Sequence, residues 1–423
     1  MGQFTSDLAG ARALDEADPL RTFRAEFAIP DPDLIYLDGN SLGRLPRRTM
    51  AVLQRVVEVE WGEQLIRSWG EGWFQASQAV GEKIARLVGA APGQVIVSDS
   101  TSVNLYKLAM AALENRPGRK RIVSDVFNFP SDLYILQGCI RQHGSRHTLY
   151  LVPSRDGIHI DLQEMKAAID ADTALVVLSL VAFKSAFLYD AAEITAHAEK
   201  VGAQVIWDLS HAAGAVPVDL DGWGAHFAIG CSYKYLNGGP GAPAYLYVRR
   251  DLQSQALNPI WGWFGTQRQF AFDLDYCPAA GIERFLCGSP PILAMLALEP
   301  GLDLIHQAGM GRIRQKSILL TAYLIYLFDQ FLAPLGFTLG SPRQPELRGS
   351  HVSIRHPAGY QINRALIEEM NLIPDFREPD NIRLGLAPMY TSFTEVWHAV
   401  QRVRRVVLEG RFQAYPAQRQ AVT

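Results

Sequence analysis

The chain has 423 residues, of which 48% are hydrophobic and 20% are charged, and this composition excludes a disordered, fibrous or minimal disulfide-stapled protein. Its 40 basic and 43 acidic residues give a formal net charge of −3, which excludes a global basic field for nucleic acid or an anionic membrane. We therefore expect a small-molecule partner.

The amino-terminal segment and the cysteines indicate where the protein works. The segment MGQFTSDLAGARALDEADPLR lacks the apolar core of a signal peptide, and no later stretch approaches the roughly 18 apolar residues of a membrane span. Cys139, Cys231, Cys277 and Cys287 are too sparse and irregular for a disulfide framework or a CxxC metal site. We expect a cytoplasmic protein with reduced thiols, no membrane contact and no metal.

Short β-rich runs alternate with helix-compatible segments through the first 250 residues. One such helical segment is Ala191–Val201, and most of the runs are apolar on both faces, which is typical of strands covered by helices on both sides. The runs are QVIVS (94–98), RIVSD (121–125), TLYLV (148–152), ALVVLS (174–179), QVIWD (204–208), FAIGC (227–231) and AYLYV (244–248). They predict βαβ units and one large, mostly parallel sheet.

The pattern changes beyond about residue 300. A long helical stretch over Leu302–Leu332 is followed by strand candidates at Gly336–Leu339 and His351–Arg355 and by a terminal helix over Thr394–Leu408. We expect an α/β protein with a large domain over 51–300, a smaller α+β domain over 301–423, and a segment over 1–50 that packs on the smaller domain.

Two polar segments each follow a predicted strand. Asp208-Leu-Ser-His211 ends one strand, and Lys234 lies between the next strand and the glycine-rich turn that ends at Gly241. Ligand sites in α/β sheets lie at the carboxyl ends of strands. A lysine that loses solvation there is a candidate for Schiff-base formation, although a lone lysine is most often a surface residue.

Other residues of these segments favour a Schiff-base lysine over a surface lysine at position 234. Asp208 offers a carboxylate for a protonated pyridine nitrogen, or alternatively caps a following helix. His211 is either a buried structural histidine or a group that supports cofactor chemistry. Ser100-Thr-Ser opens a helix with an apolar face, so its amides and hydroxyls either hold a phosphate or simply cap the helix.

These segments carry a family resemblance that covers nearly the whole chain. DLSHAAGAVPVDL (208–220) followed by CSYKYLNGGPG (231–241) resembles the pyridoxal phosphate (PLP) segment of fold-type I enzymes, and specifically of the kynureninase family. Further blocks that match in order are YLDGNSLG (36–43), STSVNLYK (100–107), NFPSDLY (128–134), GWFG (262–265), RFLCGSPPI (284–292) and NIRLGLAPMYTSF (381–393).

The resemblance implies PLP bound as a Schiff base to Lys234, with Phe129 stacked on its ring. It also implies a homodimer with shared active sites, in which Trp263 and Ser289 reach the phosphate from the neighbouring subunit. The remaining cofactor contacts that it implies are Thr101, Ser102, Pro130, Ser131, Asp132, Ser179, Asp208, His211 and Tyr233.

The activity implied is hydrolysis of L-kynurenine to anthranilate and L-alanine in tryptophan metabolism. Lys234 is expected to carry protons, and Tyr233 either acts as a general acid or only binds the phosphate. Arg383 is expected to grip the substrate carboxylate through its guanidinium fork. Asn40 and Trp69 are the other substrate-binding candidates.

Several positions depart from versions common in the family and bear on substrate choice. Thr266 and Trp69 stand where many members have histidine, and Gly288-Ser289 resembles the pair of bacterial enzymes that prefer kynurenine. These residues favour L-kynurenine, with 3-hydroxykynurenine as an alternative, because one hydroxyl is a small difference for a pocket to read. In SLVAFKSAF (179–187) only Ser179 keeps the family pattern.

Two rival functions remain at this point. Asp208, His211 and Lys234 also suit other fold-type I reactions, such as transamination or cysteine desulfuration, but a desulfurase needs a mobile reactive cysteine, and none here lies in a glycine-rich loop. A non-catalytic binding protein that keeps the fold is expected to lose one of Lys234, Asp208 or Arg383.

Overall fold

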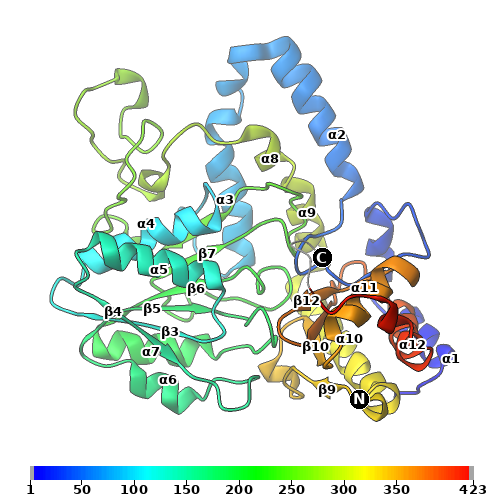
Figure 1. The fold of residues 1–423 in the computed structure, drawn as a ribbon. Helices are drawn as coiled ribbons and strands as arrows, with labels where there is room; N and C mark the ends of the chain where they lie inside the picture. Colours follow the sequence, from blue (N-terminus) through cyan, green and yellow to red (C-terminus); the bar gives the residue numbers. More distant parts are fainter. Residues whose placement is uncertain (1–3, 419–423) are drawn as a thin grey trace.

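The computed structural model describes residues 4–418 and places two sheets side by side (Figure 1). The large sheet has the strand order β2-β8-β7-β6-β5-β3-β4. All of its neighbouring pairs are parallel except those that involve β8, which runs against β2 and β7. The predicted mostly parallel sheet is therefore confirmed.

The strands of the large sheet follow the predicted runs closely, and β3, β4 and β6 have the predicted bounds. The strands are β2 (Val95–Val97), β3 (Arg121–Asp125), β4 (Thr148–Val152), β5 (Thr173–Ser179), β6 (Gln204–Asp208), β7 (Phe227–Gly230) and β8 (Tyr245–Val248). The helices of this part are α2 (Arg47–Arg55), α3 (Ala76–Leu87), α4 (Thr101–Glu114), α5 (Pro130–Gln142), α6 (Leu162–Ala168), α7 (Ala191–Val201), α8 (Ile292–Leu296) and α9 (Glu299–Ala308).

Alternation along the buried strands gives the sheet two apolar faces. On β6, Val205 and Trp207 belong to one hydrophobic core and Ile206 belongs to another. The first core includes side chains of α6 and α7, and the second includes side chains of α4 and α5, so helices cover both faces.

The smaller sheet is antiparallel and lies against helices of the carboxyl-terminal part. Its strand order is β12-β13-β10-β9, and a separate parallel pair joins β1 to β11. The elements are β1 (Ile35–Tyr36), β9 (Thr338–Leu339), β10 (His351–Arg355), β11 (Leu372–Ile373), β12 (Asp375–Arg377), β13 (Asn381–Gly385), α1 (Leu8–Glu16), α10 (Met310–Phe331), α11 (Gly359–Glu369) and α12 (Phe393–Leu408).

The long helix predicted over Leu302–Leu332 is wrong as a single element. It is two helices, α9 and α10, separated at Gly309, whose φ of 78° ends the first one. The boundary expected at residue 300 falls inside α9, and Leu302 and Ile305 of that helix pack in the core of the large sheet.

Parts of the amino-terminal segment contact the smaller domain. The carboxylate of Asp15 accepts hydrogen bonds from the backbone N–H groups of Phe393 and Thr394 at the start of α12. Leu37 and Ile35 belong to the core of the smaller domain. From there the chain crosses to the large sheet and rises as α2, away from the body (Figure 1).

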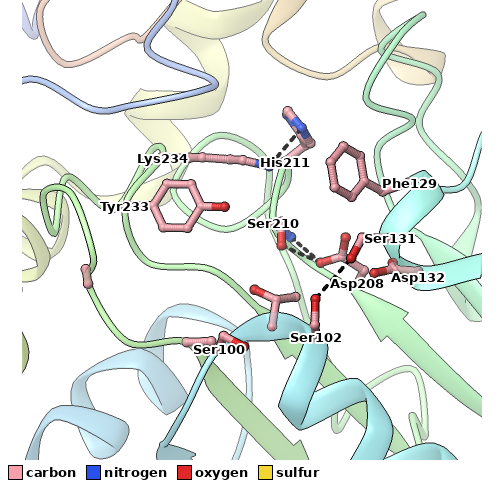
Figure 2. A pocket seen from close by; sticks show the side chains of 13 residues that line it. Ser100, Ser102, Phe129, Ser131, Asp132, Asp208, Ser210, His211, Tyr233 and Lys234 are labelled. Atoms are coloured by element: carbon pink, nitrogen blue, oxygen red, sulfur yellow. Dashed lines mark hydrogen bonds between the residues drawn. The ribbon is translucent and has the colours of Figure 1, made fainter. Parts of the chain in front are cut away.

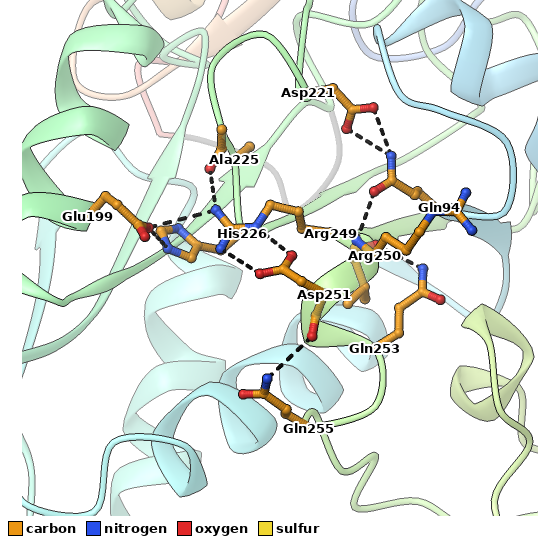
Figure 3. Close-up of polar contacts among 12 residues, drawn as sticks. Gln94, Glu199, Asp221, Ala225, His226, Arg249, Arg250, Asp251, Gln253 and Gln255 are labelled. Carbon is orange, nitrogen blue, oxygen red and sulfur yellow. Dashed lines mark hydrogen bonds and ion pairs between the residues drawn. The ribbon is translucent and has the colours of Figure 1, made fainter.

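A group of polar contacts lies at the amino-terminal edge of the parallel strands in the large sheet (Figure 3). His226 precedes β7, and its Nε2 lies 2.6 Å from a carboxylate oxygen of Glu199. Arg249 follows β8 and pairs with Asp251 at 2.8 Å. Because β8 is antiparallel to β7, both residues lie at the amino-terminal edge of the parallel strands, which leaves the opposite edge free for a ligand site.

Among the described residues, no helix combines the length and hydropathy that crossing a membrane requires.

Candidate active site

A pocket opens at the carboxyl ends of the parallel strands (Figure 2). Its walls come from segments far apart in the sequence: the start of α4, the start of α5, the ends of β6 and β7, and the turn after Gly241. The lining residues are Ser100, Thr101, Ser102, Phe129, Ser131, Asp132, Asp208, Ser210, His211, Tyr233, Lys234, Ala242 and Ala244. This is the edge at which ligands bind in open α/β sheets.

The floor of the pocket is the amino terminus of α4. Ser100 is its N-cap, and its hydroxyl accepts a hydrogen bond from the backbone N–H of Val103 at 3.4 Å. The hydroxyl of Ser102 lies 3.0 Å from that of Ser131, which belongs to the first turn of α5. Free amides at a helix start, together with these hydroxyls, form a site for a phosphate group.

Asp208 stands at the centre of the pocket with only 5% of its surface exposed. One carboxylate oxygen accepts hydrogen bonds from the backbone N–H of Ser210 at 2.9 Å and from its hydroxyl at 2.5 Å. The other oxygen receives a longer contact of 3.4 Å from the hydroxyl of Ser179, which donates to Asn128 at 2.7 Å. The carboxylate is therefore held in one orientation by the ends of neighbouring strands.

Lys234 projects into the pocket from the loop after β7. Its Nζ lies 3.0 Å from Nε2 of His211, 5.9 Å from the ring centre of Phe129 and 6.0 Å from that of Tyr233. The loop is braced by Gly43, whose N–H donates to the carbonyl of Tyr233 at 2.8 Å. A Cβ on Gly43 would collide with the backbone carbonyl of Lys234, so only glycine allows this approach.

Burial favours the uncharged forms of several groups around Lys234. It raises the pKa of the Asp132 carboxyl well above its usual value, and the charge of Asp208 raises it further. It lowers the pKa of His211 well below its usual value, with Lys234 as the next cause. Burial also raises the pKa of the Tyr233 hydroxyl, so this group remains a hydrogen-bond donor at neutral pH.

Arg383 lies outside the pocket lining, on β13 of the smaller sheet, and is 1% exposed. Its guanidinium donates to the carbonyl of Phe183 at 2.7 Å and to the hydroxyl of Ser41 at 2.8 Å, and it forms a close ion pair with Asp375. Its Nε is buried without a hydrogen-bond partner among the described residues. The guanidinium thus joins the smaller sheet to the amino-terminal segment and to the large domain.

Other predicted site residues lie elsewhere in this chain. Pro130 is the first residue of α5, and Ser179 is buried behind Asp208, so neither lines the pocket. Trp263 is 39% exposed, and Ser289 and Gly288 are exposed on the side of the molecule that carries α2.

The substrate candidates Asn40 and Trp69 are also outside the pocket lining. Asn40 is fully buried beneath Gly385, and neither of its amide atoms has a hydrogen-bond partner among the described residues. Trp69 packs on Trp73 and Phe264, with ring centres 5.8 and 5.9 Å apart.

Sequence reasoning missed Ser210 and Asn128. Both stand inside the quoted blocks, and Ser210 makes the shortest contact to Asp208. The signal was the position of a serine two residues after a strand-terminal aspartate, where its N–H and hydroxyl can both reach back to the carboxylate.

Comparison with known proteins settles the family. The kynureninase of Pseudomonas fluorescens is 46% identical over 394 residues, which cover 92% of each chain. The chain belongs to the kynureninase family. The kynureninase of Burkholderia pseudomallei strain K96243 is 43% identical over 94% of each chain, and residues 313–403 match the kynureninase C-terminal domain.

Solved structures show the fold more broadly. The apo cysteine desulfurase of Thermococcus onnurineus NA1 superposes with a TM-score of 0.78 at 19% identity, over 94% of this chain and 98% of that one. The cysteine desulfurase CsdA of Escherichia coli gives a TM-score of 0.78 at 18% identity, over 92% of this chain and 98% of that one. The fold is therefore that of fold-type I PLP enzymes, as predicted.

The cofactor of this enzyme is PLP, and the pocket fits it. A helix amino terminus with hydroxyls suits the phosphate, a buried carboxylate suits the ring nitrogen, and an amine that points into the same space suits the aldehyde. No cysteine of the described residues lines the pocket: Cys139 and Cys231 are buried and only Cys277 is exposed.

Proposed function

We propose that the enzyme hydrolyses L-kynurenine to anthranilate and L-alanine in this pocket, with 3-hydroxykynurenine as the alternative substrate. The observation that carries the proposal is the placement of Lys234, Asp208 and the start of α4 around one cavity, in a chain 46% identical to a kynureninase. The reaction adds water to the γ-carbonyl and breaks the bond between Cβ and Cγ. This pathway step belongs to tryptophan metabolism.

Each part of the pocket has a separate task in this proposal. When bound, PLP supplies the electron sink that makes removal of the Cα proton accessible. Asp208 holds the ring nitrogen, and Thr101 and Ser102 bind the phosphate with the amides of α4. Phe129 would stack on the ring, and Ser131 and Asp132 add polar groups to the same pocket.

Lys234 would hold the cofactor through its amine, and its Nζ would be the group that carries a proton for the reaction. His211 lies 3.0 Å from its Nζ, and burial lowers the pKa of this ring, which favours its neutral form; Nε2 of His211 can therefore accept a hydrogen bond from Lys234. Tyr233 keeps its proton at neutral pH because burial raises its pKa, and it donates this hydrogen to the phosphate.

Arg383 binds the substrate carboxylate. Its present partners include the hydroxyl of Ser41 and the carboxylate of Asp375, so a substrate carboxylate competes with these two groups for the guanidinium. Ser41 stands two residues before Gly43, which contacts the loop of Lys234, so displacement at Arg383 is expected to move this segment.

The enzyme acts as a cytoplasmic homodimer with shared active sites in this proposal. An apolar groove lies beside α2, and Trp61 and Leu293 in its wall are 56% and 40% exposed. Apolar surface of this extent is typical of an interface. Trp263 and Ser289 lie on the same side of the molecule, where they are free to reach a second copy's phosphate site.

The residues expected to set substrate choice also lie toward that surface. Thr266 uses its hydroxyl to donate to the carbonyl of Cys277 at 2.8 Å, so this hydroxyl is not free for a substrate. Trp69 offers only an indole N–H. The scarcity of free polar groups favours L-kynurenine over its 3-hydroxy form.

The direct test incubates the PLP-loaded enzyme with L-kynurenine or 3-hydroxykynurenine and measures the aromatic acid and alanine together. Equal amounts of both products are expected, with the higher kcat/KM on L-kynurenine. Transamination would consume the substrate without releasing anthranilate, and a binding protein would release neither product. Either result would overturn the proposal.

Two variants separate the roles within the pocket. Lys234→Ala is expected to lose both the activity and the long-wavelength absorbance of lysine-bound PLP. Arg383→Ala is expected to keep that absorbance and to raise KM by about 10- to 100-fold, since a charge-assisted hydrogen bond contributes about 1.5–3 kcal/mol. Normal turnover by Lys234→Ala would remove the basis of the assignment.

Mixed dimers test the shared site. Lys234→Ala and Trp263→Ala are each expected to be impaired alone, but random mixing of the two should restore about a quarter of wild-type activity, because half of the dimers then carry one intact site. No recovery in a mixture shown by native mass spectrometry to contain mixed dimers would exclude the shared site.

A further inference from the structure

A second buried histidine, His351, faces the active site from the smaller domain. It lies on β10, where it pairs with Gly385, while Ser353 pairs with Arg383 of β13. Cross-strand partners point to the same face of a sheet, and residues two apart on one strand share that face. His351, Ser353 and Arg383 therefore all point toward the large domain.

The large domain meets each of these side chains. The hydroxyl of Ser353 donates to the carbonyl of Lys184, and the guanidinium of Arg383 donates to the carbonyl of Phe183. The ring of His351 lies beside that of His211, with ring centres 5.6 Å apart and planes inclined by 54°. The smaller sheet thus presents an imidazole to the histidine that contacts Lys234.

Three of the four ring nitrogens of His211 and His351 lack a hydrogen-bond partner among the described residues. His351 is fully buried, and neither of its ring nitrogens has hydrogen-bond geometry to any described residue, although the carbonyl of Phe183 comes near enough to raise its pKa slightly. Nδ1 of His211 is buried and likewise unpartnered. A buried polar group without a partner costs about 1–3 kcal/mol, so three such nitrogens in one place need an explanation.

Charge decides which nitrogen of His211 carries the hydrogen. When Lys234 is an ammonium it only donates, so Nε2 of His211 then accepts from Lys234 across their 3.0 Å contact. The hydrogen of the neutral ring then sits on Nδ1 and requires an acceptor. Burial lowers the pKa of His351 well below its usual value, with Arg383, Lys234 and Arg377 as further causes, so this ring is also neutral and has one accepting nitrogen.

We propose that His351 is a positioning residue, which accepts the Nδ1 hydrogen of His211 through one water and so fixes the tautomer whose Nε2 accepts the hydrogen bond of Lys234. The proposal rests on the proposed role of Lys234 as proton carrier. Because Arg383 and His351 lie on adjacent strands, the sheet that binds the substrate carboxylate also orients the group beside the proton carrier.

The test uses histidine labelled with ¹⁵N in the cofactor-free enzyme, where NMR reports the tautomer of each ring independently of catalysis. Signals are assigned by comparing His211→Gln and His351→Gln with the wild type. The wild type should show His211 protonated at Nδ1 only. A wild-type His211 protonated at Nε2 would overturn the proposal without any variant.

Substitutions then test the dependence on His351. His351→Leu should give mixed His211 tautomers and a kcat lower by at least about tenfold, since loss of tautomer control is costly in acid–base catalysis. His351→Gln, whose amide oxygen can still accept, should restore the tautomer and most of kcat. Val352→Ala, which faces the opposite side of the same strand in the domain core, should leave the tautomer unchanged.

The outcomes are distinguishable from failure of the proposed function. Absence of kynurenine cleavage by the wild type would overturn the proposed function but leave the NMR result standing. A single Nδ1–H tautomer of His211 in folded His351→Leu would overturn the positioning role even if cleavage is normal, and so would mixed tautomers in folded His351→Gln. An equal change in Val352→Ala would show a merely structural effect.

Discussion

Ser210→Ala tests how the enzyme orients the carboxylate that serves the cofactor ring. The Ser210 hydroxyl donates to Asp208 at 2.5 Å and accepts from the backbone N–H of Cys231 at 3.1 Å. A hydrogen bond to a charged group contributes about 1.5–3 kcal/mol. If this whole contribution is lost from the interaction between Asp208 and the ring nitrogen, kcat/KM falls by about 10- to 100-fold, at about tenfold for each 1.4 kcal/mol.

The matched control is Ser179→Ala, because Ser179 contacts the other oxygen of Asp208 only at 3.4 Å and donates mainly to the neutral Asn128. We expect its kcat/KM to stay within about fivefold of wild type, since neutral hydrogen bonds contribute about 1 kcal/mol. Steady-state release of anthranilate is the assay, with bound PLP quantified to correct for occupancy. A larger loss in Ser179→Ala than in Ser210→Ala would refute the reasoning.

Two further predictions concern stability. Gly230→Ala should shorten the half-life of activity at elevated temperature, because a Cβ there would overlap the buried ring of Tyr245 at a cost of about 1–3 kcal/mol, whereas Gly118→Ala, with open space around it, should not. Equal half-lives for the two variants would contradict the packing argument. Burial lowers the pKa of His226 to about 4, despite its contact with Glu199. Because the unfolded chain binds this proton at about pH 6.5, stability should fall by up to about 3 kcal/mol as pH drops from 6.5 toward 4. His226→Gln should show a shallower dependence in thermal unfolding at pH 7 and pH 5, and an unchanged slope would exclude His226 as its source.

Local patterns predicted the large sheet well because its strands are buried on both faces. Gln204–Asp208 and Ala191–Val201 have the predicted bounds, since continuous apolar runs and helix-compatible spacing leave little ambiguity there. The break at Gly309 was missed because an isolated glycine is tolerated inside helices, and only the packing of α9 on the large core requires a turn at that point.

The residue types of the candidate site were predictable from blocks of sequence, but their distances were not. Lys234 and Asp208 stand at the ends of adjacent strands, so topology alone brings them together. His351 gave no signal in the sequence, because its face of β10 is defined only by pairing with β13 and by docking against the large domain.

By itself, the sequence determined the strands of the large sheet, the helix over Ala191–Val201, the family to which the chain belongs, and the lysine and aspartate of the pocket. Only the tertiary structure decided that Arg383 is already engaged by Ser41 and Asp375, and that His351 faces His211. The physical reason is how far apart in the sequence the interacting residues lie. Periodicity and strand ends are encoded by neighbouring residues, whereas hydrogen bonds between domains depend on how two separately folded sheets meet.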